Sequence, residues 1–339
     1  METILVEEHY ILTDVQEKVR NLVSKDPKGV PLETMLSALE EKTDFHGEDD
    51  LDQHKTRMKF MNDNNVRMQV LSYGKEAPSL LTGQAGIKLC QLCNDVLGEY
   101  VDLRPTRFQG LAVLPINEPE AAAQELRRSV KELGLKGALI AGRGEDGTFL
   151  DHPKYEGIFE AAAELNVPIY LHPAPIKSEV YQAYYNSSSY DDVTASIFAS
   201  FGYGWHVETG IHAVRLVLSG LLDRYPNLQI ILGHWGEFVP FFLERMDQAI
   251  ISEHLKQPIS MYFKNNFYIT PSGMLSKPQF EMIRHYFGID RILYASDYPY
   301  IKPEGLTTFL DELNLTPTEQ AKIAYQNAER LFNIDTEQD

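Results

Sequence analysis

Cysteine and tryptophan are scarce in this chain of 339 residues, which contains two of each. The two cysteines, Cys90 and Cys93, form one CxxC pair within IKLCQLCNDVLGEYV, whose apolar residues recur at helical spacing. A structural zinc site would need a second ligand pair, and the sequence has none. We therefore expect the pair to serve the packing of a helix.

Basic residues are also few. The chain has 31 Lys and Arg against 49 Asp and Glu, a formal net charge of −18. No stretch concentrates Lys and Arg as a phosphate-binding surface requires, so we expect no nucleic acid partner. An anionic substrate would have to be met by local positive groups, such as a metal ion or a few arginines.

Long apolar runs are missing, because nowhere do about 18 apolar residues follow one another. The N-terminal stretch METILVEEHYIL has neither the basic nor the long apolar region of a secretory signal. We therefore expect a cytoplasmic protein with no membrane partner. No glycine-rich phosphate turn follows the first apolar run, which disfavours a doubly wound nucleotide-binding sheet.

What the sequence does contain is a series of short apolar runs separated by helical stretches, a pattern typical of βα units with a parallel sheet. The predicted strands are residues 3–8, 67–72, 109–114, 137–141, 168–172, 229–233, 267–270 and 291–295. Eight such strands predict an α/β fold, a closed (β/α)8 TIM barrel, as a single domain over residues 1–339.

Three segments are longer than a minimal barrel needs. They follow the first, second and fifth predicted strands, at residues 11–65, 75–107 and 174–206. The last is rich in Tyr, Ser and Gly and begins at a strand end. We expect it to form part of a substrate pocket, with a decorated surface loop as the alternative.

Ionisable residues recur at the C-terminal ends of the predicted strands, where the active site of a barrel lies. These residues are Glu7, His9, His172, His234 and Asp297. Because residues i and i+2 of a strand point to the same side, Glu7 and His9 can both face the barrel axis while Glu8 turns away.

Four of these residues would make a metal site. Glu7, His9, His172 and Asp297 form a mixed nitrogen and oxygen set that suits Zn²⁺ or Mn²⁺ and leaves coordination positions open. Taken singly, a histidine at a strand end is more often structural, and an aspartate before Tyr-Pro can simply cap a turn. Their repeated placement at one edge favours a metal, because such a buried cluster would be costly without a cation.

The motifs that hold these residues resemble one family. ExH in the first strand, HP after the fifth, LGHWGE after the sixth and SDYP after the eighth are similar to the amidohydrolase-2 (ACMSD-like) family. Within it the chain resembles the γ-resorcylate (2,6-dihydroxybenzoate) and 2,3-dihydroxybenzoate non-oxidative decarboxylases. The likeness continues through RMKFMNDNNVRMQVLS, NNFYITPSG and NAERLFNI.

The resemblance implies roles for residues at matching positions. Glu7, His9, His172 and Asp297 would bind one divalent metal ion, and Asp297 would also donate a proton to the ring carbon of the substrate. By the same likeness, His234 and Glu237 would be catalytic or contact the substrate. Arg57 and Arg245 would bind the substrate, with Arg245 reaching a neighbouring subunit of a homodimer or homotetramer.

Two reactions fit one such site. In a decarboxylase of a hydroxylated aromatic acid, such as a dihydroxybenzoate, the metal would hold the carboxylate and an ortho hydroxyl, Asp297 would supply the proton, and His234 would polarise the phenolic oxygen. In a hydrolase of an amide, ester or lactone, Asp297 would accept a proton from bound water and His234 would stabilise the oxyanion. The ExH motif and the overall likeness favour the lyase. A third hypothesis is a barrel that binds a ligand or partner without catalysis. In such a protein we would expect some metal ligands to be missing, and here all four candidates are present.

The sequence departs from the resorcylate enzymes at two places. His206, in GYGWHVETG, stands where a smaller or apolar residue is expected, and the segment 174–206 does not read closely like theirs. These differences leave the identity of the acid open. His212 lies on a helical stretch, where we expect a packing role.

Overall fold

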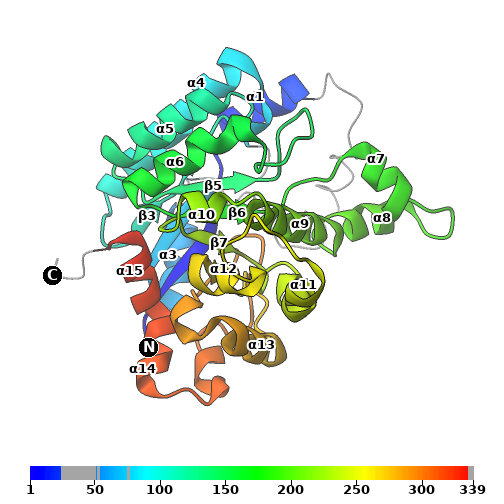
Figure 1. The fold of residues 1–339 in the computed structure, drawn as a ribbon. Coiled ribbons are helices and arrows are strands. Elements are labelled where there is room, and N and C mark those ends of the chain that lie inside the picture. The colour runs from blue at the N-terminus through cyan, green and yellow to red at the C-terminus, as the bar shows by residue number, and fades with distance from the viewer. Residues whose placement is uncertain (24–50, 52–53, 75–76, 335–339) are drawn as a thin grey trace.

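Parallel strands form the centre of the molecule in a computed structural model, which describes residues 1–23, 51, 54–74 and 77–334 (Figure 1). The strands are β1 (Thr3–Tyr10), β2 (Val66–Tyr73), β3 (Phe108–Gly110), β4 (Ala112–Val113), β5 (Ala138–Ala141), β6 (Ile169–His172), β7 (Ile230–Leu232) and β8 (Phe267–Ile269). They pair in the order β1-β2-β3 and β4-β5-β6-β7-β8. Each of these pairings is parallel.

Backbone hydrogen bonds join the two ladders into a closed barrel. The Leu111 amide donates to Leu71 in β2, and the Ala112 amide donates to Gly137, the residue before β5, so β3 and β4 are two halves of the strand predicted at 109–114. Opposite this junction, residues 292–294 bridge β8 through Ile269 and β1 through Leu5. They correspond to the eighth predicted strand. The predicted (β/α)8 barrel is therefore confirmed.

Helices surround the strands (Figure 1). They are α1 (Thr13–Val23), α3 (His54–Asp63), α4 (Gly83–Asp102), α5 (Pro119–Lys131), α6 (Glu156–Leu165), α7 (Ser178–Val180), α8 (Asp192–Ala199), α9 (Gly204–Leu218), α10 (Leu221–Arg224), α11 (Leu243–Ala249), α12 (Ile259–Asn266), α13 (Lys277–Phe287), α14 (Pro317–Ala321) and α15 (Asn327–Phe332). Short 3-10 or π segments lie at Pro78–Leu80, Pro153–Tyr155, Tyr181–Tyr185, Val239–Phe242, Ile289–Arg291, Phe309–Leu313 and Lys322–Gln326. Within the described residues, no helix combines the length and the apolar character needed to cross a membrane.

Local sequence explains the helix ends. Proline stands in the first turn of α5, followed by Glu120, and Arg128 and Lys131 lie in its last turn, which complements the helix dipole at both ends. The helix α6 ends at Asn166, which adopts a left-handed conformation that asparagine tolerates.

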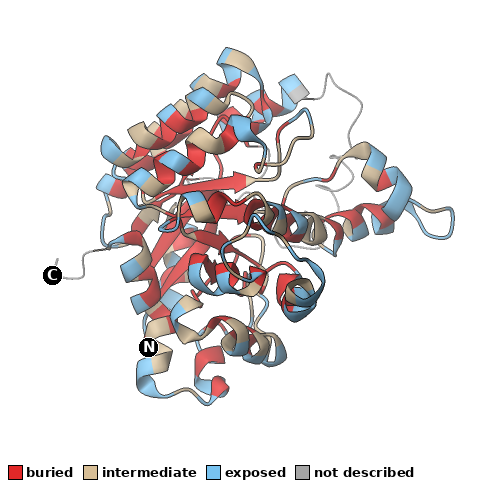
Figure 2. Cartoon of the chain, in the orientation of Figure 1, coloured by how far each residue is buried: buried red, intermediate tan, exposed pale blue. Residues whose placement is uncertain are grey.

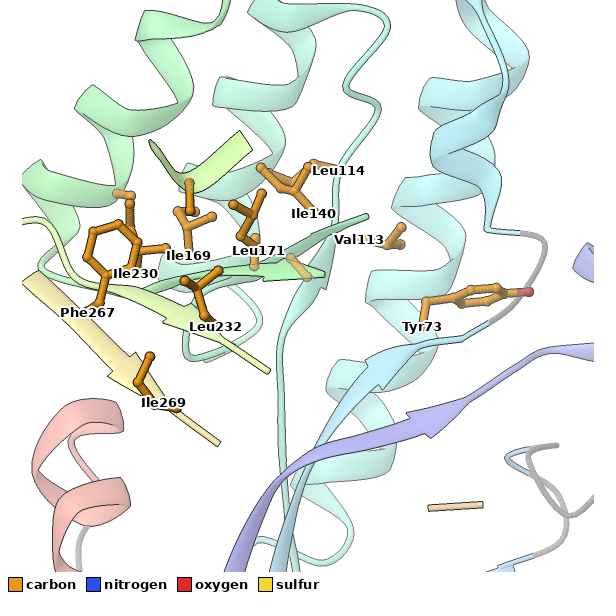
Figure 3. Close-up of a cluster of buried hydrophobic side chains, with 14 of the residues drawn as sticks. Tyr73, Val113, Leu114, Ile140, Ile169, Leu171, Ile230, Leu232, Phe267 and Ile269 are labelled. Atoms are coloured by element: carbon orange, nitrogen blue, oxygen red, sulfur yellow. The ribbon is translucent and has the colours of Figure 1, made fainter. Parts of the chain in front are cut away.

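The apolar core has two layers, because successive strand residues point to opposite faces. Figure 3 shows one layer, in which Ile169, Leu171, Ile230, Leu232 and Phe267 belong to the cluster between strands and helices. The other layer fills the barrel interior and consists mainly of Ile4, Val6, Met68, Val70, Leu111, Leu139, Tyr170, Ile231, Tyr268 and Leu293. Burial is accordingly continuous along the strands and on the inner sides of the helices (Figure 2).

A β-bulge in β1 breaks this alternation. Leu5 pairs with Gln69 and Glu8 pairs with Leu71, so three steps along β1 match only two along β2. Val6 faces the barrel interior, and Glu7, the next residue, does so too, where it bonds to side chains beyond β8. Bulges beside active sites commonly redirect side chains in this way.

The three long segments differ in how much of them is described. In 11–65 the structure describes α1, residue 51, α3 and the residues beside them, whereas residues 24–50 and 52–53 lie outside the described part. The segment 75–107 contains α4, in which Cys90 and Cys93 are buried free thiols. Burial raises the pKa of both thiols. The segment 174–206 holds α7, α8 and the start of α9, and it extends from the barrel at the right of Figure 1.

Candidate metal centre and active site

Four of the predicted residues converge at the C-terminal end of the barrel. Ligand atoms of Glu7, His9, His172 and Asp297 all lie within 4.8 Å of one another. The His9 Nε2 atom is 3.1 Å from Asp297 Oδ1, and the His172 Nε2 atom is 3.5 Å from Glu7 Oε1. The structure thus brings together the side chains that strand-end placement predicted.

The two histidines are oriented by their other ring nitrogens. His172 Nδ1 is 2.8 Å from the carbonyl oxygen of Pro173, which can only accept, so Nδ1 carries the proton and Nε2 presents a lone pair. Burial, followed by the neighbouring His9 and His234, holds the pKa of His172 well below its usual value. His9 Nδ1 is 3.1 Å from Ser72 Oγ. Neutral, oriented imidazoles are what a metal site requires.

Two buried polar atoms lack a partner at this point. Thr270 Oγ1 donates to Glu7 Oε2 at 2.9 Å, and the Ser272 hydroxyl donates to the same oxygen. Among the described residues, Glu7 Oε1 and His9 Nε2 make no hydrogen bond and face only the other candidate metal ligands, at 3.5 and 3.1 Å. Burial raises the pKa of Glu7, which marks the cost of its charge here. A divalent cation would satisfy both orphaned atoms, so the residues present fit the expected metal.

A second group lies beside the first and consists of His206, His234 and Glu237. Each oxygen of the buried Glu237 carboxylate meets one histidine, at 2.7 Å from His234 Nδ1 and 2.8 Å from His206 Nδ1. Burial lowers the pKa of His234, but Glu237 and the nearby carboxylates outweigh it and raise that pKa to about 9. The His234 Nε2 atom lies 3.9 Å from Asp297 Oδ2, which links the two groups.

The backbone that carries His234 and Glu237 is strained. All five residues from 234 to 238 have positive φ, between 48° and 84°. Only the glycine among them adopts such values at little cost, and strain of this kind gathers at functional sites. Asp297 and Ser272 also have positive φ, of 62° and 45°. Trp235 is buried, as a core residue is expected to be, and its indole donates to the Met274 carbonyl oxygen.

The two predicted arginines lie in different surroundings. Arg57 on α3 is buried, donates to the His9 carbonyl oxygen and, at 3.1 Å, to Gln69 Oε1, and lies 4.9 Å from the centre of the Tyr298 ring. These contacts support β1 behind the metal centre. Arg245 is exposed on α11. A contact of either arginine with a substrate stays a prediction.

Several side chains of the site were not assigned a role from sequence. They are Ser72, Thr270 and Ser272, which hold His9 and Glu7, and Tyr300, whose ring centre is 5.2 Å from that of His9. Thr270 and Ser272 stand at i and i+2 after a strand in NNFYITPSG, a spacing that could have indicated a shared face. The sequence marks His206 as a departure from the resorcylate enzymes and indicates no function for it.

Comparisons with known proteins bear on this site. Residues 42–334 match the amidohydrolase family. The γ-resorcylate decarboxylase of Polaromonas sp. is 34% identical over 84% of this chain and 89% of its own length. A solved Staphylococcus aureus protein described as an amidohydrolase is 53% identical, with a TM-score of 0.89 over 98% of this chain and all of its own.

A third relative was solved with a metal. The dihydroxybenzoic acid decarboxylase of Polaromonas sp., with bound manganese and the inhibitor 2-nitroresorcinol, is 30% identical, with a TM-score of 0.80 over 98% of this chain and 97% of that one. Its manganese agrees with the predicted Zn²⁺ or Mn²⁺ cofactor. The resemblance to the aromatic acid decarboxylases is confirmed, and the chain belongs to the amidohydrolase family.

Proposed function

We propose that the protein is a metal-dependent non-oxidative decarboxylase of a hydroxylated aromatic carboxylic acid, such as a dihydroxybenzoate. The position of Asp297 is the observation that carries this proposal. Its Oδ1 atom faces His9 at 3.1 Å and its Oδ2 atom faces His234 at 3.9 Å. The carboxyl group thereby stands between the metal donors and a polar side chain that can contact a substrate oxygen.

A divalent ion held by Glu7, His9, His172 and Asp297 would bind the substrate carboxylate and a neighbouring hydroxyl and so fix the ring. Asp297 gives a proton to the ring carbon that bears the carboxylate. The bond from that carbon to the carboxylate then breaks, its electron pair returns to the ring, and CO2 leaves. Asp297 regains its proton from solvent.

His234 supports the substrate during this step. Its Nδ1 is bound to Glu237, so the ring is held with Nε2 toward Asp297 and available to a phenolic oxygen of the substrate. Glu237 is buried and cannot reach solvent, and it serves to orient the imidazole. The barrel end thus supplies binding, orientation and one proton.

A substrate panel tests the reaction. The purified protein, loaded with Mn²⁺ or with Zn²⁺, is offered hydroxybenzoates alongside amides, esters and lactones, and CO2 and hydrolysis products are measured. We expect CO2 from at least one hydroxybenzoate. Hydrolysis products alone would identify a hydrolase that uses the same residues and would overturn the proposal.

Replacement of the proton donor tests its role. Asp297→Asn should lower kcat by about 10²- to 10⁴-fold, because the amide cannot deliver a proton. The measurement is made at saturating Mn²⁺ with the metal content determined, so that weaker metal binding cannot account for the loss. Unchanged circular dichroism serves as the folding control. Native-like turnover by the loaded variant would remove Asp297 from the proton transfer.

We also propose that the enzyme is cytoplasmic and works as a homodimer or homotetramer in which Arg245 reaches a neighbouring site. Large apolar side chains are exposed around α11, with Phe241 65%, Phe242 62% and Ile251 91% accessible. Exposed apolar groups gathered in one region support an interface. Arg245 is itself exposed on α11.

A further inference from the structure

The structure places His206 against Glu237, beside the active site, rather than in solvent. We propose that His206 is a positioning residue that holds the Glu237 carboxylate and, through it, the ring of His234. The kinetic part of this inference rests on the proposed decarboxylase function. The structural part does not.

The Glu237 carboxylate needs two donors. It is 1% exposed, and its Oε1 atom is taken by His234. Among the described residues, the hydrogen bond to Oε2 comes from His206 Nδ1 at 2.8 Å. Without His206 that oxygen would be buried with no donor, which is costly for a charged group and would free the carboxylate to rotate.

The protonation of His206 follows from its other neighbours. Trp205 Nε1 lies 3.0 Å from His206 Nε2, and an indole nitrogen only donates, so Nε2 must accept and carries no proton. The proton is then on Nδ1, where it donates to Glu237. The Phe201 carbonyl oxygen lies 3.2 Å from the same Nε2 and could bond only to a protonated Nε2, but the shorter contact with Trp205 favours the unprotonated form. Both nitrogens are therefore engaged within the protein, which makes His206 a positioning residue and not a substrate contact.

The packing of α9 on the loop 234–238 places His206 close to Glu237 and His234. The helix packs so closely on the strained loop that a Cβ atom at Gly210 would lie 2.2 Å from the Glu237 carbonyl oxygen. The rings of His206 and His234 are 4.3 Å apart between centres, with Glu237 bridging their Nδ1 atoms. The order Trp205, His206, Glu237, His234 thus runs from the segment 174–206 to the side chain that faces Asp297.

His206, His234 and Glu237 could instead hold a second metal ion. The distances from the two Glu237 oxygens to Nδ1 atoms, 2.7 and 2.8 Å, fit hydrogen bonds that already use both oxygens. We therefore expect one metal ion per chain in the native protein and in His206 variants. Two ions per native chain, with the second lost on substitution of His206, would overturn the proposal.

Paired substitutions test the donor. Asn places an amide nitrogen near the position of Nδ1, whereas Phe fills the space without a donor. On the hydroxybenzoate that the native enzyme decarboxylates fastest, we expect His206→Phe to lower kcat about 10- to 100-fold with KM changed less than about threefold, and His206→Asn to stay within about threefold of native. Native kcat in His206→Phe, or equal losses in both variants, would overturn the proposal.

A spectroscopic measurement separates this inference from the proposed function. In the native protein labelled with ¹⁵N-histidine, the His206 signals, assigned by their loss in His206→Asn, should report a protonated Nδ1 and an unprotonated Nε2. A protonated Nε2 would overturn the assignment, whether or not any substrate is found. If the native protein decarboxylates no acid in the panel, the proposed function fails and the spectrum still decides the role of His206. If His206→Phe does not fold, His206→Ala takes its place.

Discussion

Two adjacent glutamates in β1 illustrate how much depends on single residues. Glu7 faces the barrel axis with one oxygen unpartnered among the described residues. Glu8 faces outward, where its carboxyl group accepts bonds from the Ser296 amide and hydroxyl, both at 2.8 Å, and from Gln69 at 3.2 Å. Burial raises the pKa of Glu8 to about 8, so it is mostly a neutral acid at pH 7. The two side chains are equally buried, but Glu7 is a candidate metal ligand whereas the carboxyl group of Glu8 is bonded within the protein.

This pair gives a matched test of the metal site. We expect Glu7→Gln to weaken Mn²⁺ binding more than about 100-fold, because a charged oxygen ligand is lost, and Glu8→Gln to keep native metal content. Metal is measured after dialysis against a fixed free Mn²⁺ concentration. Chelation should likewise lower the thermal midpoint of the native protein more than that of Glu7→Gln. Equal metal loss in both variants would mean that Glu7 acts only through folding.

His212 allows a prediction of stability against pH. It is buried, its Nε2 accepts from the Leu150 amide at 3.0 Å, and burial, aided by Arg215 and Arg143, lowers its pKa from 6.5 to about 3. Between pH 3 and pH 6.5 this histidine is protonated in the unfolded chain and neutral in the folded protein. The stability of the folded protein therefore falls as the pH drops below 6.5. The His212 pKa shift should lower the free energy of unfolding by about 2 kcal/mol between pH 7 and pH 5.

His212→Gln should abolish that part of the loss, because the amide oxygen can accept from Leu150 and does not titrate. Denaturant unfolding at pH 7 and pH 5 measures the difference. His254→Gln, at an exposed histidine, is the control and should keep the native pH dependence. An unchanged pH dependence in His212→Gln would show that the buried ring is not the source of acid sensitivity.

The candidate ligands could be predicted from sequence because they stand at strand ends, where chemistry in a barrel gathers. Their partners could not. Ser72 and Ser272 reach His9 and Glu7 only through the register of neighbouring strands, and the bulge that turns Glu7 inward leaves no mark in the pattern of apolar residues. The protonation of His206 likewise depends on an indole that only the fold brings near.

At the scale of elements, the contact between α9 and the loop 234–238 is the critical one. Gly210 allows the helix backbone to approach Glu237, and the same helix carries His206. Any displacement of α9 would therefore move the donor away from its carboxylate. The sequence predicted the helix but gave no sign that a glycine in its middle set the distance to a strained loop.

A methyl group at this position should disturb both stability and activity. We expect Gly210→Ala to destabilise the protein by about 1–3 kcal/mol, since backbone atoms must shift, and to lower kcat. Gly157→Ala on α6 is the control. Of the described residues, its added methyl would meet only the Ala123 Cβ, at 3.7 Å, so we expect stability unchanged or raised by up to about 1 kcal/mol. Native stability and kcat in Gly210→Ala would show that the helix and loop can separate at no cost.

The closure of the barrel shows where element prediction reached its limit. Eight apolar runs sufficed to predict the strands. The third, however, is divided at the point where its backbone amides change partner from β2 to the start of β5. The eighth forms two isolated bridges in the described part of the chain. Both features come from the tilt and stagger needed to close eight strands, a property of the whole barrel and not of either segment.

At the scale of the whole molecule, the proposed assembly bears on whether one chain makes a complete site. The chain is strongly acidic, with a net charge of −18, so an anionic substrate has to be met by positive groups close to the site. Arg245 lies on α11 beside exposed apolar side chains and would serve a neighbouring subunit if that surface is an interface. The family resemblance implies this role for Arg245, and it stays a prediction because it depends on a second subunit.

Mixed oligomers test this arrangement. Arg245→Ala and Asp297→Asn should each lose activity, the former without metal loss. If Arg245 acts across the interface, subunits of the two variants that are unfolded together and reassembled should recover about a quarter of native activity for random dimers, because half are mixed and each mixed dimer has one intact site. If Arg245 acts within its own chain, every site in the mixture keeps one defect and no activity returns. A fully active native monomer in sedimentation and activity measurements would contradict the cross-subunit role outright.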